Sequence, residues 1–112
     1  MSRDAATLLD IVRAAQLILE FKEGMNQTAF GKDPKSQAAI AHQLMVIGEA
    51  VKRLSSGFRE SHPEIPWALI AGMRDKLIHA YDVVDLDEVW HTASVDVPQL
   101  LVAIEPLLPE QK

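Results

Sequence analysis

The apolar residues near the C-terminal end repeat more regularly than any others in the chain. They recur at steps of four and three over three heptads: Leu86, Trp90, Ala93, Val97, Leu100, Ile104 and Leu107. One face of an α-helix has this period, so the spacing predicts a helix with a single buried stripe. Pro98 lies inside the stretch. Because proline has no N–H to donate, it predicts a kink or a split into two helices.

Two earlier segments carry the same periodicity. A first helix is expected over residues 4–23, ended by Gly24, and a second begins at Asp33-Pro34, which offers a cap and a first-turn proline, and runs to Ser55. Residues 25–32 lack an apolar stripe and are expected to form a loop.

The middle of the chain predicts a connector and a third helix. Gly48 in the second helix predicts a close crossing by another backbone. Residues 56–66 contain one glycine and two prolines, so we expect a connector there. A third helix is expected from Pro66 to Ala80, and a short turn then leads to the C-terminal helix.

Together these segments predict an all-α fold, an up-and-down bundle of four helices, with a fifth short helix if Pro98 splits the last one. With 112 residues, 48% of them hydrophobic, the chain is expected to form one domain over residues 1–112 with one core. It has no cysteine, no signal-peptide pattern and no long apolar run, which favours a cytoplasmic protein without a membrane span.

The formal charge of −5 argues against a broad basic surface, so any contact with nucleic acid must be local. Two basic clusters, Lys32 with Lys35 and Lys52 with Arg53 and Arg59, are interpreted as solvated helix faces.

A candidate site falls at the end of the expected third helix, where Arg74, His79 and Tyr81 form the pattern Arg-x4-His-x-Tyr. Arginine offers a charged planar fork that fits phosphate oxygens, and histidine can exchange a proton near neutral pH. The tyrosine hydroxyl can donate to phosphate or be modified. The pattern suits chemistry on a phosphodiester, although its spacing also fits ordinary surface charges near a helix end.

The geometry of an ideal helix predicts the relative directions of these side chains around the helix axis. Asp75 and His79, four apart, would stack, so Asp75 could orient the imidazole. Arg74 and Tyr81 would lie within ~20° of one face, whereas Arg74 and His79 would lie ~140° and ~7.5 Å apart. A two-fold dimer would bring two copies of the motif together around one groove.

Three segments together resemble a known family. They are Ile47-Gly48-Glu49-Ala50, His62-Pro63-Glu64-Ile65-Pro66-Trp67, and Met73 to Tyr81. The chain resembles a HepT-type toxin of the HEPN superfamily over nearly its whole length. The resemblance implies a dimeric helical bundle with the motif in the dimer cleft, and a metal-independent endoribonuclease without a cofactor.

The resemblance also assigns residues and partners. Arg74, Asp75 and His79 would be the catalytic residues acting on RNA. Proteins of this type are paired, in a type VII-like toxin-antitoxin system, with a minimal nucleotidyltransferase antitoxin that transfers AMP to the motif tyrosine. Tyr81 is the expected modification site.

Two other classes of function remain open. Glu88-x-x-His91, with Glu20, Glu23 and Glu49, is half of a di-iron pattern, but a second Glu-x-x-His is lacking. A non-catalytic module that only binds the nucleotidyltransferase and serves as its substrate also fits the acidic charge. His42, His62 and His91 are interpreted as surface or partly buried residues.

Overall fold

The structure, a computed structural model, describes residues 2–73, 75, 78–79 and 83–109, and the predicted all-α fold is confirmed. The elements in chain order are α1 (Arg3–Lys22), α2 (Gln27–Gly31), α3 (Pro34–Lys52), α4 (Ser56–Ser61), α5 (Trp67–Ala71), β1 (Ile78–His79), β2 (Val83–Val84), α7 (Leu86–His91), the π-helix η1 (Thr92–Asp96), α8 (Val97–Ile104) and the 3₁₀ turn η2 (Glu105–Leu107). Within these residues, no helix combines the length and apolar character needed to cross a membrane.

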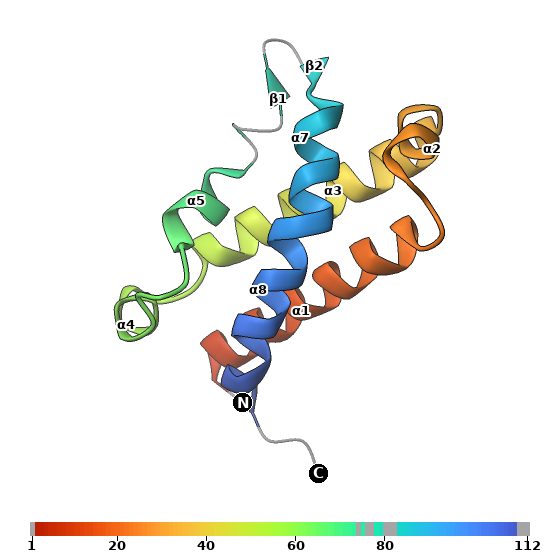
Figure 1. Cartoon of the computed structure of the whole chain (residues 1–112). Coiled ribbons are helices and arrows are strands. Elements are labelled where there is room, and N and C mark those ends of the chain that lie inside the picture. The colour runs from red at the N-terminus through yellow and green to blue at the C-terminus, as the bar shows by residue number, and fades with distance from the viewer. Residues whose placement is uncertain (1, 74, 76–77, 80–82, 110–112) are drawn as a thin grey trace.

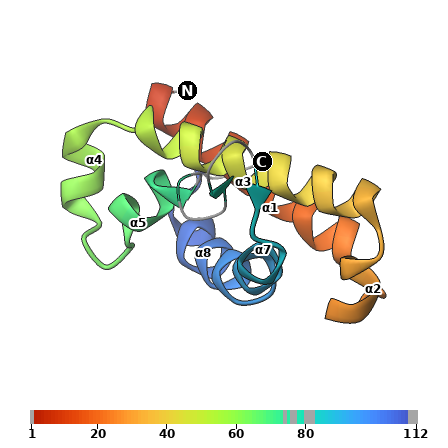
Figure 2. The same cartoon turned by 90° about the horizontal axis from the view of Figure 1, so that it is seen from above.

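The long helices form two layers. Helices α1 and α3 lie side by side and run in opposite directions, and the continuous rod from α7 to α8 crosses this pair (Figure 1). Seen from above, the rod points nearly along the view while α1 and α3 lie across it (Figure 2). The C-terminal helix therefore packs across the first two instead of extending the up-and-down order that we expected.

Capping side chains and a glycine set the limits of α1 and the start of α3, at positions that can be recognised in the sequence. Ser2 Oγ accepts a hydrogen bond from the Ala5 N–H at 3.0 Å, and Gly24 takes a φ of 77° just after α1. Asp33 caps α3: its carboxylate accepts from the Ser36 N–H at 3.4 Å and from the Ser36 hydroxyl at 2.7 Å. These hydrogen bonds hold the pKa of Asp33 below its ordinary value. The predicted Asp33-Pro34 start is confirmed.

Two short helices replace segments that we expected to be irregular. The predicted loop over residues 25–32 contains α2, whose N-cap Asn26 accepts a hydrogen bond from the Ala29 N–H at 2.8 Å. The predicted connector contains α4, capped by Ser55 through the Phe58 N–H at 3.1 Å. Both expectations were wrong because a cap and tertiary packing stabilise helices too short to show an apolar stripe.

Asp4 ties the start of α1 to the start of α4. Its carboxylate accepts hydrogen bonds from the Ser55 N–H at 2.9 Å and from the Ser55 hydroxyl at 2.7 Å. The side-chain bond is the larger cause that lowers the pKa of Asp4. The contact joins residues 51 positions apart, so it helps to hold α4 against the N-terminus of the chain.

The helix is irregular near Pro98, as predicted, but it is not split in two, because α7, η1 and α8 follow one another without a gap. The helix widens into the π-helix η1 before α8, and the Val97 N–H donates to the Thr92 carbonyl five residues earlier. Proline at position 98 cannot donate to Ser94, and its ring crowds the Ser94 carbonyl, so an enlarged turn relieves the clash.

The core is one apolar cluster between the two layers. Its largest fully buried side chains are Phe30, Leu8, Ile11, Ile18, Ile40, Leu44, Ile47, Ile104, Val51, Val89 and Val97. Gly48 makes the closest backbone approach, since a Cβ added there would lie 3.2 Å from the Ile70 carbonyl oxygen and 3.9 Å from Met73 Cβ. The tight crossing expected at Gly48 is confirmed, and it lets α5 lie directly on α3.

Gly48→Val is expected to lower the free energy of unfolding by about 1–3 kcal/mol, because the branched side chain must push α5 away from α3. Urea denaturation measures the effect. Gly57→Ala in α4 is the control, since an added Cβ there meets nothing within 4 Å. Equal stability of Gly48→Val and the parent would show that α5 does not depend on this close packing.

Candidate functional site

The motif segment joins α5 to α7. Helix α5 ends at Ala71, with Gly72 as its C-cap. Further on, β1 and β2 pair antiparallel, with Ile78 opposite Val84 and His79 opposite Val83. These two strands lie beyond the end of α7 (Figure 1). Of the three residues of the pattern Arg-x4-His-x-Tyr, the structure thus places the backbone of His79, which lies in β1.

The expected helix through Ala80 is wrong at His79, because the His79 backbone lies in β1. Met73 and Asp75 are still helical. Asp75 and His79 therefore do not stack four residues apart on one helix, and the helical angles predicted for the motif do not hold at His79. Gly72 is a poor helix former, and the β-branched residues Ile78, Val83 and Val84 favour a strand pair, which accounts for the change.

The structure places one of the four candidate side chains. Asp75 is exposed, and its N–H donates to the Gly72 carbonyl at 3.1 Å. Among described residues its carboxylate has no hydrogen bond or ion pair, so it is available to a substrate or to another side chain. Arg74 and Tyr81 lie outside the described residues, and for His79 the backbone alone is described.

Both ends of the motif segment are fastened to the core. On one side, Met73 is only 6% exposed and packs in the main apolar cluster, immediately before Arg74. On the other side, Asp85 caps α7 by accepting a hydrogen bond from the Glu88 N–H at 3.1 Å. The segment is thus attached to a rigid element at each end, which is how folds commonly present functional loops.

A pocket of about 360 Å³ lies beside this segment, between α5 and the C-terminal rod. Met73 lines it together with Thr92, Asp96 and Gln99. Sequence reasoning did not select these polar residues. A signal was present, however, because Thr92, Asp96 and Gln99 are spaced by four and three and so share one face of the last helix.

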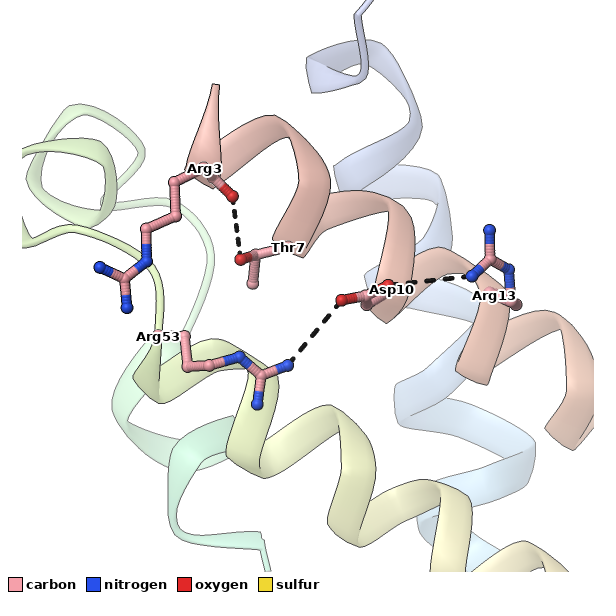
Figure 3. Close-up of polar contacts among 5 residues, drawn as sticks. All are labelled: Arg3, Thr7, Asp10, Arg13 and Arg53. Carbon is pink, nitrogen blue, oxygen red and sulfur yellow. Dashed lines mark hydrogen bonds and ion pairs between the residues drawn. The ribbon is translucent and has the colours of Figure 1, made fainter. Parts of the chain in front are cut away.

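Most of the other charged side chains that the structure describes are exposed to solvent, as the sequence predicted. Asp10 lies between Arg13 and Arg53, with an N···O distance of 3.9 Å to each (Figure 3). Lys52 pairs with Glu49 at 3.1 Å, and all these side chains are about half exposed or more. Such exposed pairs contribute little to stability, so the interpretation as solvated faces is confirmed for Lys52 and Arg53. Arg59, which we grouped with them, is instead half-buried.

The metal-site alternative finds no support in the fold. Among the described residues, no three His, Asp or Glu side chains come together as a metal-binding group, and these residues include Glu88 and His91. His42 and His91 are exposed and His62 is half-buried, as expected. His62 lies 3.6 Å from Glu64 through its Nδ1.

The described residues form a small all-α domain, which is consistent with a HEPN-like helical fold. A family model described as Ribonuclease HepT-like matches residues 11–107, and the chain belongs to this family. The match includes the whole motif segment, so the resemblance drawn from the sequence is confirmed.

Relatives support the same assignment. A Thermococcus cleftensis protein named as a probable ribonuclease HepT is 45% identical over 100 residues, which cover 89% of this chain and 91% of the relative. A protein of Caldanaerobacter subterraneus subsp. tengcongensis named as a candidate RNase is 39% identical over 102 residues, 91% of each chain. One from Methanocaldococcus jannaschii, named in the same way, is 39% identical over 103 residues, 92% of this chain and 85% of the relative. No solved structure matches the chain significantly.

Proposed function

We propose that this chain is a metal-independent endoribonuclease and the toxin of a toxin-antitoxin pair. The observation that carries the proposal is the family match over residues 11–107, which contains an unbroken Arg-x4-His-x-Tyr pattern. The relatives named as ribonucleases support RNA as the substrate. A local site also suits a chain of formal charge −5, which has no broad basic surface to hold RNA.

The proposed reaction is an internal transesterification of RNA. The ribose 2′-oxygen forms a bond to the adjacent phosphorus while the bond from phosphorus to the 5′-oxygen breaks, which leaves a 2′,3′-cyclic phosphate and a 5′-hydroxyl. His79 moves the proton from the 2′-hydroxyl toward the leaving 5′-oxygen. Arg74 binds the nonbridging oxygens, where negative charge develops.

Asp75 is proposed as a positioning residue for His79. The strand at His79 removes the helical stacking that first suggested the pair. The exposed carboxylate of Asp75, which has no partner among the described residues, is nevertheless only four residues away in the same segment. Asp75→Asn should shift the pH profile of cleavage, because a carboxylate beside an imidazole favours its charged form. An unchanged profile would remove Asp75 from the site.

RNA cleavage by the purified chain in the presence of a chelator tests the function. Cyclic-phosphate ends on a denaturing gel are the expected result. A protein of unmodified intact mass that cuts no RNA would contradict the nuclease and favour the non-catalytic binding module, for which the acidic charge is the supporting feature.

We further propose that a nucleotidyltransferase antitoxin silences the chain in the cytoplasm by transferring AMP from ATP to the Tyr81 hydroxyl, with pyrophosphate as the leaving group. The added bulk and negative charge would stand near Arg74 and repel RNA. Incubation with the transferase and ATP should raise the intact mass by whole AMP units and stop cleavage, and Tyr81→Phe should prevent both effects. An equal mass increase in Tyr81→Phe would assign the modification to another residue.

The proposed homodimer predicts twice the chain mass in solution by light scattering.

A further inference from the structure

The pocket beside the motif has an apolar floor. It lies between α5 and the C-terminal rod, and its buried apolar lining residues are Ile65, Ile70, Met73, Val97 and Leu100. Leu69, which also lines it, is 77% exposed. A volume of about 360 Å³ lies within the range of small-molecule sites, so the pocket is large enough for one planar aromatic group.

A buried hydroxyl in this lining has no partner in the described part of the chain. Thr92 is 1% exposed, and its Oγ1 makes no hydrogen bond to the described residues. Thr7, at 5% exposure, shows the usual solution in a helix, since its hydroxyl donates to the Arg3 carbonyl at 3.0 Å (Figure 3). An unsatisfied buried hydroxyl costs free energy, but this oxygen has almost no accessible surface, so a ligand in the pocket does not reach it as the side chain lies.

Thr92 and Asp96 begin and end the π-helix η1. The wider turn changes the direction of the side chains relative to a regular α-helix, and such turns are frequent at functional sites. Asp96 is half-buried, and its carboxylate has no hydrogen bond or ion pair within the described part of the chain. Two polar side chains on one irregular turn are thus left with unused hydrogen-bonding capacity.

The charge of the pocket argues against phosphate as the ligand. Glu64 and Asp96 line it, and no Lys, Arg or His does so among the described residues. Ionised carboxylates only accept hydrogen bonds. The pocket therefore suits a neutral, flat group that presents N–H donors, and a phosphate would be repelled.

The pocket also adjoins the proposed catalytic segment. Met73 lines it and directly precedes Arg74, the proposed phosphate ligand. Because Met73 and Arg74 are neighbours in the sequence, a base in this pocket would be close to the motif segment. Proteins that read RNA sequence commonly take unstacked bases into such sites.

We propose that this pocket binds a guanine base of the RNA substrate and sets where the chain cuts, an inference that rests on the proposed ribonuclease function. The guanine edge presents two adjacent donors, N1–H and the N2 amino group, which match the two oxygens of the Asp96 carboxylate. The exposed amide of Gln99 donates to guanine O6. Adenine, cytosine and uracil lack a pair of adjacent donors, so the carboxylate discriminates against them.

Nucleoside binding tests the base site without its phosphate. Guanosine, inosine and adenosine are titrated into the parent chain and followed by amide NMR shifts. Inosine lacks the N2 amino group, so we expect guanosine to bind about tenfold more tightly than inosine, and adenosine more weakly still. Equal binding of guanosine and adenosine, or no binding of guanosine, would overturn the proposal.

Asp96→Asn removes the paired acceptors with almost no change of shape. It should abolish the preference for guanosine over inosine and the preference for cleavage beside guanosine in RNA. Glu105→Gln is the matched control, because it makes the same charge change at an exposed position outside the pocket. A preference that survives Asp96→Asn would exclude the carboxylate as the reader of the base.

A second pair of variants tests the pocket itself. Ala103 is exposed and lines the pocket, whereas Val102 is 74% exposed and does not line it. Ala103→Trp should block guanosine, and Val102→Trp should not. If the parent binds no guanosine and Ala103→Trp converts an oligomer into a monomer by light scattering, the pocket is an interface between copies and the base site is wrong.

The two proposals fail in different ways. His79→Ala should lose RNA cleavage and keep guanosine binding, because the base site does not use the imidazole. A parent chain that binds guanosine as expected and cuts no RNA would contradict the nuclease alone. A parent chain that cuts RNA without regard to the neighbouring base would contradict the guanine site alone.

Discussion

Replacing His79 with alanine is expected to slow RNA cleavage by about 10²- to 10⁴-fold, the usual contribution of a positioned acid-base group. Without the imidazole, the 2′-hydroxyl must lose its proton to water. Initial rates on a denaturing gel, in chelator and with a fixed RNA, measure the loss. Arg74→Ala should cost roughly 10²- to 10³-fold, because one charge-stabilising donor is removed from the phosphate oxygens.

Control variants separate catalysis from folding. His42→Ala in α3 and His91→Ala at the end of α7 change exposed histidines and should leave the cleavage rate within about twofold of the parent. The melting temperature of His79→Ala should stay close to that of the parent. A folded His79→Ala protein that cuts RNA as fast as the parent would remove histidine catalysis from the mechanism.

Phe30→Ala is expected to lower the free energy of unfolding by about 3–5 kcal/mol, as for other fully buried aromatic residues. Phe30 is 1% exposed although it belongs to a helix of only five residues, and its ring centroid lies 5.2 Å from that of Trp90. The aromatic pair joins α2 to α7. Its loss leaves a cavity and frees α2 from the core.

Thermal and urea unfolding measure this effect, and a drop of roughly 10 °C or more in melting temperature is expected. Phe21→Ala is the matched control, because Phe21 is 37% exposed on α1 and should cost much less. Similar losses in the two variants would mean that α2 is not held by Phe30. RNA cleavage by Phe30→Ala well below its melting temperature should remain close to that of the parent, since Phe30 is outside the motif segment.

Local sequence signals predicted the long helices and their ends. The apolar stripes of α1, α3 and the C-terminal rod each extend over several turns, so chance alternation is averaged out. Gly24, Asp33-Pro34 and Pro98 act through backbone geometry and missing donors, which depend little on distant residues. The family resemblance came from the motif together with the Gly48 and His62 segments, and the family match confirmed it.

The short elements required tertiary contacts. Helices α2 and α4 have five and six residues, too few to be stable in isolation or to show a stripe. Buried Phe30 and the Asp4–Ser55 hydrogen bonds hold them in place. The strand at His79 also depends on pairing with Val83, a partner that periodicity along one segment does not reveal.

The sequence by itself determined the all-α class, the principal helix ends, the irregular turn near Pro98 and the family, because each depends on local periodicity, backbone chemistry or an ordered motif. The tertiary structure alone decided that the C-terminal rod crosses α1 and α3 and that His79 lies in a strand. It also decided that Met73, Thr92 and Asp96 meet around one pocket. These features depend on how side chains far apart in the chain pack against one another. The order of residues along one segment does not show that packing.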